Sequence, residues 1–280
     1  MFDIKRFNIT GFNMTVREWV KDGELRGRIT FSFNTLLQSF PQASQQVVLN
    51  DLHRLKRQGI IYSPYKSFYV VLPPQYALRR CVPPFYFMND LMRHLNKDYY
   101  FSTMTAAMLW GAAHQSPQQS FVTTTYPKLN TSVTSKASIR WFFRNEIPSH
   151  LICEKKGETG TIRYSNAELT AIELVQYEHY LGGLSNVATI LSDLLESTDF
   201  AHASEGAFSV CKDSSVQRLG YIVEKVLGDE LQGEVIYHEW VRCCPAPHYQ
   251  KLSLRSNEAV LKRDERWKID INTIIEADET

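Results

Sequence analysis

One stretch of the sequence, from Ser44 to Leu72, holds side chains that could read the edges of nucleic-acid bases. Gln and Asn amides suit adenine in the major groove, while Arg suits guanine or a phosphate group. The candidate contacts lie on the polar side of one predicted helix: Gln45, Gln46, Asn50, His53, Arg54 and Arg57. Their types and spacing point to the recognition of DNA, and Ser44 joins them at the start of the helix.

The helix that must position these side chains is marked at both ends. Ser44 is a good N-cap, because its hydroxyl can accept a hydrogen bond from a free backbone N–H of the first turn. Val48, Leu52 and Leu55 recur at helical spacing and form one apolar stripe. Gly59 stands where a C-terminal capping glycine is expected.

Two β-rich runs follow this helix. Ile60–Tyr62 and Phe68–Leu72 carry β-branched and aromatic residues, and the polar segment 63–67 separates them, which predicts a hairpin. Lys66 would lie at its tip, placed to reach a phosphate or the minor groove.

The elements upstream complete the pattern. Helices are predicted over Thr15–Leu25 and Phe33–Phe40, with a short extended run at Ile29–Phe31 between them, and Pro41 separates the second helix from the third. Three helices followed by a hairpin in under 80 residues is the order of a winged helix-turn-helix. An ordinary surface helix and hairpin would explain the stretch from Ser44 alone, but not this order. Arg26 and Arg28, after the first helix, are added to the candidate DNA contacts.

Charge is divided unevenly along the chain. The whole chain has a formal net charge of +1. Residues 1–80 contain 12 Lys and Arg against 5 Asp and Glu, which gives +7, and the remainder contains 19 against 25, which gives −6. Such asymmetry indicates one part that binds a polyanion and another part with a different task.

Length and composition predict two domains in a chain of 280 residues. We expect a winged helix-turn-helix domain over 1–78 and a larger, helix-rich mixed α/β domain over 79–280, with the proline pairs at 73–74 and 83–84 near the junction. The overall class is therefore α+β or mixed α/β. No apolar run is long enough to span a membrane, and the five cysteines suggest free thiols, so we expect a cytoplasmic protein.

A search for catalytic motifs gives mostly negative results. The sequence has no phosphate-binding P-loop, no G-x-G-x-x-G and no D-x-D, and the H-E-x-x-H pattern that starts at His238 has Arg242 in place of its second histidine. We expect a protein that is not an enzyme, with no catalytic residues, no metal and no cofactor. His114, after the predicted helix Thr103–Ala113, is open to two interpretations, a functional group or a helix-capping histidine.

Several longer runs resemble the AbiEi family of antitoxins, from the type IV abortive-infection toxin–antitoxin systems of bacteria. The GAAHQ run at Gly111–Gln115 and the ELTAIELV run that begins at Glu168 are the most specific. The resemblance is spread over five segments: Leu49–Tyr76, Tyr99–Thr124, Ser165–Leu191, Arg218–Val226 and Trp267–Asp278.

This resemblance implies a division of labour. The N-terminal domain would bind inverted repeats in the promoter of its own operon and repress it. The C-terminal domain would be needed to counteract a toxin, an AbiEii-type nucleotidyltransferase, without a stable toxin–antitoxin complex. Two alternatives stay open: a winged-helix transcriptional regulator that senses a small molecule, and an enzyme such as a nuclease with a DNA-targeting domain.

Overall fold

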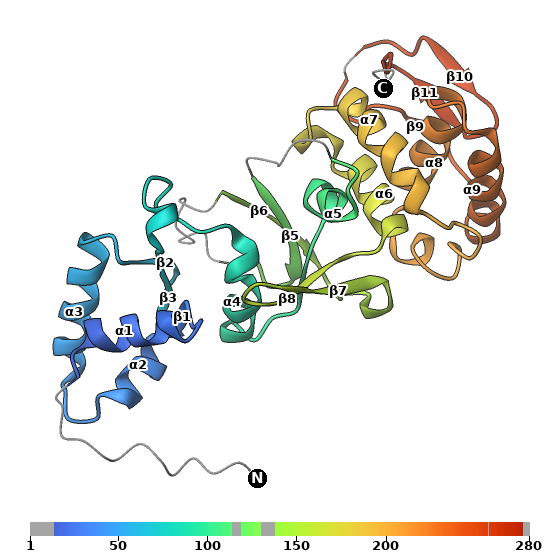
Figure 1. The fold of residues 1–280 in the computed structure, drawn as a ribbon. Helices are drawn as coiled ribbons and strands as arrows, with labels where there is room; N and C mark the ends of the chain where they lie inside the picture. Colours follow the sequence, from blue (N-terminus) through green and yellow to red (C-terminus); the bar gives the residue numbers. More distant parts are fainter. Residues whose placement is uncertain (1–13, 114–118, 130–137, 257, 277–280) are drawn as a thin grey trace. The chain divides into compact units, whose positions relative to one another are not determined.

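The computed structural model describes residues 14–113, 119–129, 138–256 and 258–276 (Figure 1). Contacts between Cα atoms group the chain into two compact units. The first consists of Met1–Asn96 with Leu129–Ala137 and Gly157–Gly160, and the second of Lys97–Lys128, Ser138–Lys156 and Thr161–Thr280. Within the described ranges, none of the helices has the length and apolar character needed to cross a lipid bilayer.

The first unit has the winged-helix arrangement that the sequence predicts. Its elements follow in the order α1 (Val16–Leu25), β1 (Thr30–Ser32), α2 (Phe33–Ser39), α3 (Gln45–Arg57), β2 (Ile61–Tyr65) and β3 (Phe68–Val71). The strands form an antiparallel sheet in the order β1-β3-β2. The prediction of an N-terminal winged helix-turn-helix is confirmed.

Local signals explain where these helices begin. Thr15 and Glu18 form a reciprocal capping box at the start of α1, and the Ser44 hydroxyl accepts a hydrogen bond from the Val47 N–H at the start of α3. Leu36 of α2 and Leu52 of α3 are fully buried in the core between the helices and the sheet. The apolar stripe of α3 therefore fixes which side of that helix faces outward.

The wing is tighter than the sequence predicts. Strand β2 continues to Tyr65, which pairs with Phe68, so only Lys66 and Ser67 form the turn. The register shifts between Tyr62 and Tyr65, and this irregularity lets the strand run through Pro64 without a regular ladder hydrogen bond. Ser67, the second residue of the turn, adopts a φ of 60°, in the left-handed region.

Two helical pieces follow the second proline pair. A 3₁₀ turn, Pro84–Tyr86, precedes α4 (Met88–His94), and a similar 3₁₀ turn occurs at Pro74–Tyr76. Each of these turns has a proline at its first position, where the fixed φ suits a helical start and the missing backbone N–H would have no partner in the helix.

A five-stranded mixed sheet with the order β6-β5-β4-β8-β7 forms one layer of the second unit. Its strands are β4 (Tyr99–Phe101), β5 (Ser120–Thr125), β6 (Ile139–Arg144), β7 (Ile152–Gly157) and β8 (Gly160–Ser165). Strand β5 runs antiparallel to β4 and parallel to β6. Helices α5 (Thr103–Trp110) and α6 (Ala167–Gln176) follow β4 and β8 directly, and they pack on each other.

The rest of the second unit is mainly helical. It contains α7 (Leu184–Leu194), α8 (Asp213–Tyr221), a π-helical turn (Ile222–Val226) and α9 (Glu230–Cys243). Short 3₁₀ turns occur at Ser149–Leu151, Glu178–Tyr180, Leu195–Ser197 and Phe208–Val210. A second small sheet, in the order β10-β11-β9, contains β9 (Gln250–Lys251), β10 (Lys262–Asp264) and β11 (Ile269–Ile271). The predicted class, α+β with a helix-rich larger part, is confirmed.

Trp267 packs directly against the backbone of α8 at Gly220. The Trp267 side chain is fully buried, and its ring stacks on that of Trp240 from α9 with the centroids 5.6 Å apart. A Cβ atom added at Gly220 would lie 2.0 Å from Cζ3 of Trp267, so only glycine allows this close approach.

Candidate functional sites

The outward face of α3 brings together four of the predicted DNA contacts. Val48, Leu52 and Leu55 point into the core, and with 100° between successive residues Gln46, Asn50, His53 and Arg57 fall on the opposite side. All four are exposed. Asn50, His53 and Arg57 also line a surface depression, together with Arg54 and Lys56. In helix-turn-helix proteins, the recognition helix presents an exposed polar face of this kind to the major groove.

Gln46 and Asn50 are connected to each other. The Gln46 Nε2 donates a hydrogen bond to the Asn50 Oδ1 over 3.0 Å. This contact leaves the Gln46 Oε1 as an acceptor and the Nδ2 group of Asn50 as a donor. An acceptor and a donor side by side match the N6 and N7 positions of adenine.

We expect that replacing Asn50 with alanine will weaken binding to the cognate site by about 1–3 kcal/mol, because one base-edge contact is lost. Binding to random DNA should change little. Fluorescence anisotropy titrations on both DNAs measure the difference, and an equal loss on random DNA would reject base reading by Asn50. Gln46→Ala should behave in the same way.

Two of the remaining candidates at α3, Ser44 and Arg54, have partners within the protein. Ser44 caps the helix through its hydroxyl, and Gln45 lies exposed in the first turn. Arg54 forms an ion pair with Asp51 over 3.2 Å, with 63% of the Arg54 side chain exposed. An exposed pair of this kind contributes little to stability, so Arg54 can exchange Asp51 for another anion at small cost.

Arg26 and Arg28 follow α1 and contact it. Arg26 pairs with Asp22 over 3.1 Å. The Arg28 guanidinium lies 3.8 Å from the centre of the Trp19 ring and covers Gly23, whose added Cβ would meet it at 2.7 Å. Arg28 thus has a packing role on α1 that the sequence did not reveal.

Lys66 is exposed at the turn of the wing. If it contacts a phosphate, Lys66→Ala should weaken binding to every sequence and reduce the slope of log K against log salt by about one unit. Titrations at several KCl concentrations measure that slope. An unchanged slope would show that Lys66 does not neutralise a phosphate.

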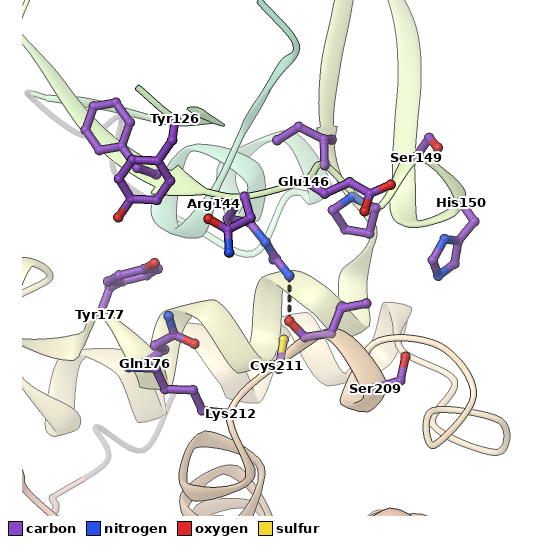
Figure 2. Close-up of a pocket in the computed structure, with 15 residues that line it drawn as sticks. Tyr126, Arg144, Glu146, Ser149, His150, Gln176, Tyr177, Ser209, Cys211 and Lys212 are labelled. Carbon is purple, nitrogen blue, oxygen red and sulfur yellow. Dashed lines mark hydrogen bonds between the residues drawn. The ribbon is translucent and has the colours of Figure 1, made fainter. Parts of the chain in front are cut away.

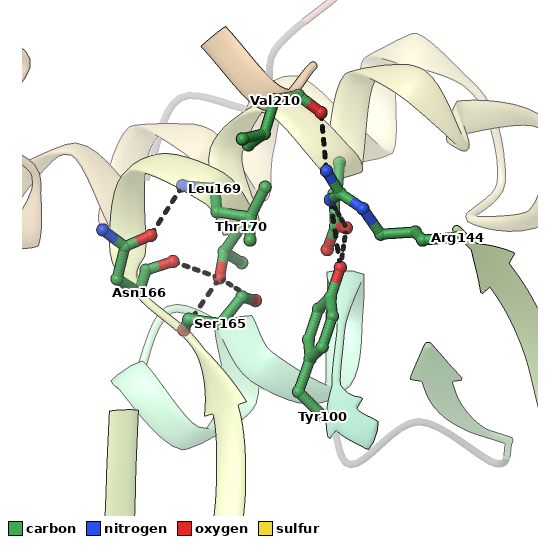
Figure 3. A network of polar contacts seen from close by, with 8 residues as sticks. Tyr100, Arg144, Ser165, Asn166, Leu169, Thr170 and Val210 are labelled. Carbon is green, nitrogen blue, oxygen red and sulfur yellow. Dashed lines mark hydrogen bonds and ion pairs between the residues drawn. The ribbon is translucent and has the colours of Figure 1, made fainter. Parts of the chain in front are cut away.

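A buried polar network crosses the second unit (Figure 3). The Tyr100 hydroxyl of β4 donates to Oε1 of Glu173 in α6 over 2.5 Å. Arg144, at the end of β6, places Nη1 3.4 Å from the same oxygen and donates from Nη2 to the Val210 carbonyl over 2.5 Å. Burial raises the pKa of Glu173 to about 7, although the hydrogen bond from Tyr100 and the charge of Arg144 lower it.

The start of α6 is fixed by a second set of polar contacts in Figure 3. Asn166 Oδ1 accepts a hydrogen bond from the Leu169 N–H over 3.0 Å, so Asn166 is the N-cap of α6. The hydroxyls of Ser165 and Thr170 lie 2.7 Å apart in the core. These contacts hold the helix that carries Glu173.

Arg144 also lines a pocket of about 650 Å³ in the second unit (Figure 2). The other lining residues come from the end of β5, the loop after β6, the end of α6 and the segment before α8: Tyr126, Phe143, 145–150, Gln176, Tyr177 and 209–212. No motif marks these residues in the sequence. The only feature of the sequence that could have pointed to the pocket is Arg144, a single arginine at the end of the aromatic strand Ile139–Arg144.

Two further points of the sequence analysis concern His114 and metal binding. His114 lies outside the described residues. Within the described ranges, no group of three or more His, Cys, Asp or Glu side chains is placed to hold a metal ion.

Comparisons with known proteins give a family match within the second unit and a similar fold. A model of the AbiEi antitoxin C-terminal domain matches residues 100–225. No curated protein matches the sequence. The fold is similar to that of the RV2827C protein from Mycobacterium tuberculosis, with a TM-score of 0.66, 14% identity and 91% of each chain covered. Residues 100–225 are therefore similar to the AbiEi antitoxin C-terminal domain, as the resemblance in the sequence predicts.

Proposed function

We propose that this protein is an autoregulatory antitoxin of a type IV toxin–antitoxin system. Residues 1–78 would bind inverted repeats in the promoter of its own operon and repress it. Residues 79–280 would counteract an AbiEii-type nucleotidyltransferase toxin, without a stable complex between the two proteins. The match to the AbiEi antitoxin domain supports the antitoxin role.

The outward face of α3 is the observation that carries the DNA-binding part of the proposal. Its amides and cations are exposed while its apolar stripe is buried, and residues 1–80 carry a formal charge of +7. A DNA-binding winged helix needs a net positive charge and a third helix whose polar face is exposed, and both features support this part of the proposal.

A gel-shift experiment with the region upstream of the gene tests this part. We expect a shift at protein concentrations well below those that shift random DNA. Arg57→Ala should weaken the specific shift, and Lys155→Ala, an exposed change on β7, is the matched control. A shift that is equal for the upstream region and random DNA would refute sequence-specific repression.

Co-expression with the neighbouring nucleotidyltransferase tests the antitoxin part. We expect this protein to restore growth that the toxin arrests, and we expect the two proteins to elute separately in size-exclusion chromatography. Failure to restore growth would count against neutralisation, and co-elution would contradict the absence of a stable complex.

The second candidate is a winged-helix regulator that senses a small molecule. The pocket beside Arg144 favours it, because its volume lies in the range of small-molecule sites. A downstream nucleotidyltransferase gene would favour the antitoxin, whereas operator binding that changes with a metabolite would favour the sensor. In both cases the protein acts by binding and not as an enzyme.

A further inference from the structure

The pocket beside Arg144 has an aromatic end and a polar end. Figure 2 shows Tyr126, Tyr177 and Gln176 toward one side, Ser149 and His150 toward the other, and Arg144 between them. All of these residues belong to the second unit and lie within the segment that matches the antitoxin domain. A ligand that spans the pocket would need a flat apolar part and a polar part.

The aromatic end is built on supported rings. The Tyr177 ring stacks on Phe142 of β6 with the centroids 3.8 Å apart and the planes 12° apart. Tyr126 and Phe143 form a second pair with the centroids 5.7 Å apart. Rings that are held by neighbouring rings lose little conformational freedom when a planar ligand packs on them. Any of the nucleobases can stack on such a ring, because every base has a flat aromatic face. Gln176 is close enough to this end to supply an amide for the edge of a base.

The centre of the pocket carries the positive charge of Arg144, whose side chain is fixed by hydrogen bonds. The Arg144 side chain is 18% exposed, and its bonds to Glu173 and to the Val210 carbonyl fix the guanidinium. Burial raises the pKa of Glu173 to about 7, so this carboxyl group compensates only part of the Arg144 charge near neutral pH. Lys212 lines the pocket and is exposed, so it adds a second cation.

Glu146 limits how much negative charge the pocket can accept. Two cations and one carboxylate line it, with His150 at the polar end. A ligand with one phosphate suits this balance better than a triphosphate, whose additional charge would be repelled by Glu146.

We propose that this pocket binds a nucleoside monophosphate, with the base against Tyr126 and Tyr177 and the phosphate at Arg144 and Lys212. This binding site adds to the antitoxin function and does not depend on DNA binding. The pocket lies in the segment that matches the antitoxin domain, and its residues are distant in sequence from α3.

Isothermal titration calorimetry on the full chain tests the proposal. The ligands are the four ribonucleoside monophosphates, their nucleosides, the triphosphates and inorganic phosphate. We expect at least one monophosphate to bind with a stoichiometry of one, about tenfold tighter than its nucleoside, its triphosphate or inorganic phosphate. The proposal is overturned if no monophosphate binds saturably at millimolar concentration, or if phosphate or the triphosphate binds as tightly.

Two exposed side chains make the test specific to this pocket. Lys212→Ala should weaken binding of the monophosphate about tenfold, because one charge-assisted contact is lost, and Tyr126→Leu should do the same through lost stacking. Lys155→Ala, an exposed lysine on β7 outside the pocket, should bind as the unmodified protein does. Equal melting temperatures confirm that the variants are folded.

Unchanged affinity of Lys212→Ala for the monophosphate would refute the assignment. A gel shift with the upstream DNA reports separately on the proposed function.

Discussion

Replacing Arg144 with methionine is expected to lower the free energy of unfolding by about 3–5 kcal/mol at pH 8, because it leaves Glu173 as a buried charge without its cation. The Glu173 side chain is only 3% exposed, so water cannot replace the guanidinium. The Val210 carbonyl would also lose its donor. Urea unfolding followed by circular dichroism measures the loss.

The pH dependence of this loss identifies its cause. The pKa of Glu173 in the folded protein, raised by burial to about 7, lies above its usual value of 4.5. The folded state therefore binds this proton more tightly than the unfolded state, and the stability that protonation contributes below pH 4.5 is lost as the pH rises through 7. The Arg144→Met variant should lose less stability at pH 5, where Glu173 can take up a proton, than at pH 8.

The double variant Arg144→Met/Glu173→Gln is the control. Glutamine is neutral at both pH values and can still accept the hydrogen bond from Tyr100, so the double variant should regain much of the stability that the single variant loses at pH 8. An equal loss at pH 5 and pH 8, or no recovery in the double variant, would show that the cost arises from packing and not from the charge of Glu173.

Gly220→Ala is expected to destabilise the second unit by about 3 kcal/mol, although alanine favours a helix more than glycine does. The new methyl group would lie 2.0 Å from the Trp267 ring, and that ring is fixed by its stack on Trp240. The ring cannot turn away without disturbing a second buried tryptophan. Urea unfolding monitored by tryptophan fluorescence reports on this site directly.

Gly206→Ala is the matched control, because a Cβ there would meet its nearest neighbours at 3.6 Å or more, an ordinary contact distance. It should change the free energy of unfolding by well under 1 kcal/mol. Similar losses in the two variants would show that the Trp267 contact does not determine the effect.

The winged helix could be predicted because its signals are local. Ser44 and Gly59 mark the ends of α3, and the spacing of Val48, Leu52 and Leu55 sets its buried side. The outward positions of Gln46 and Arg57 follow from the same periodicity. The length of β2 was predicted wrongly, since Pro64 suggested a turn whereas the irregular register lets the strand continue.

The buried network and the pocket could not be predicted, since they depend on residues distant in sequence. Tyr100 and Glu173 are separated by 73 positions, and Arg144 and Val210 by 66. The packing of Arg28 on Trp19 is closer in sequence, but it depends on how the chain turns after α1. Periodicity shows which side of an element faces inward, and it does not show which elements meet.

The packing around α8 has a consequence for any shortened version of this protein. The segment that matches the family ends at residue 225, inside the π-helical turn. Arg218, within that segment, is fully buried and donates to the carbonyl of Leu252 over 2.7 Å. A chain cut at 225 would leave this guanidinium unpaired on that side and open the groove over Gly220 to water. A fragment that folds by itself must therefore retain the chain through β11, beyond the end of the family match at residue 225.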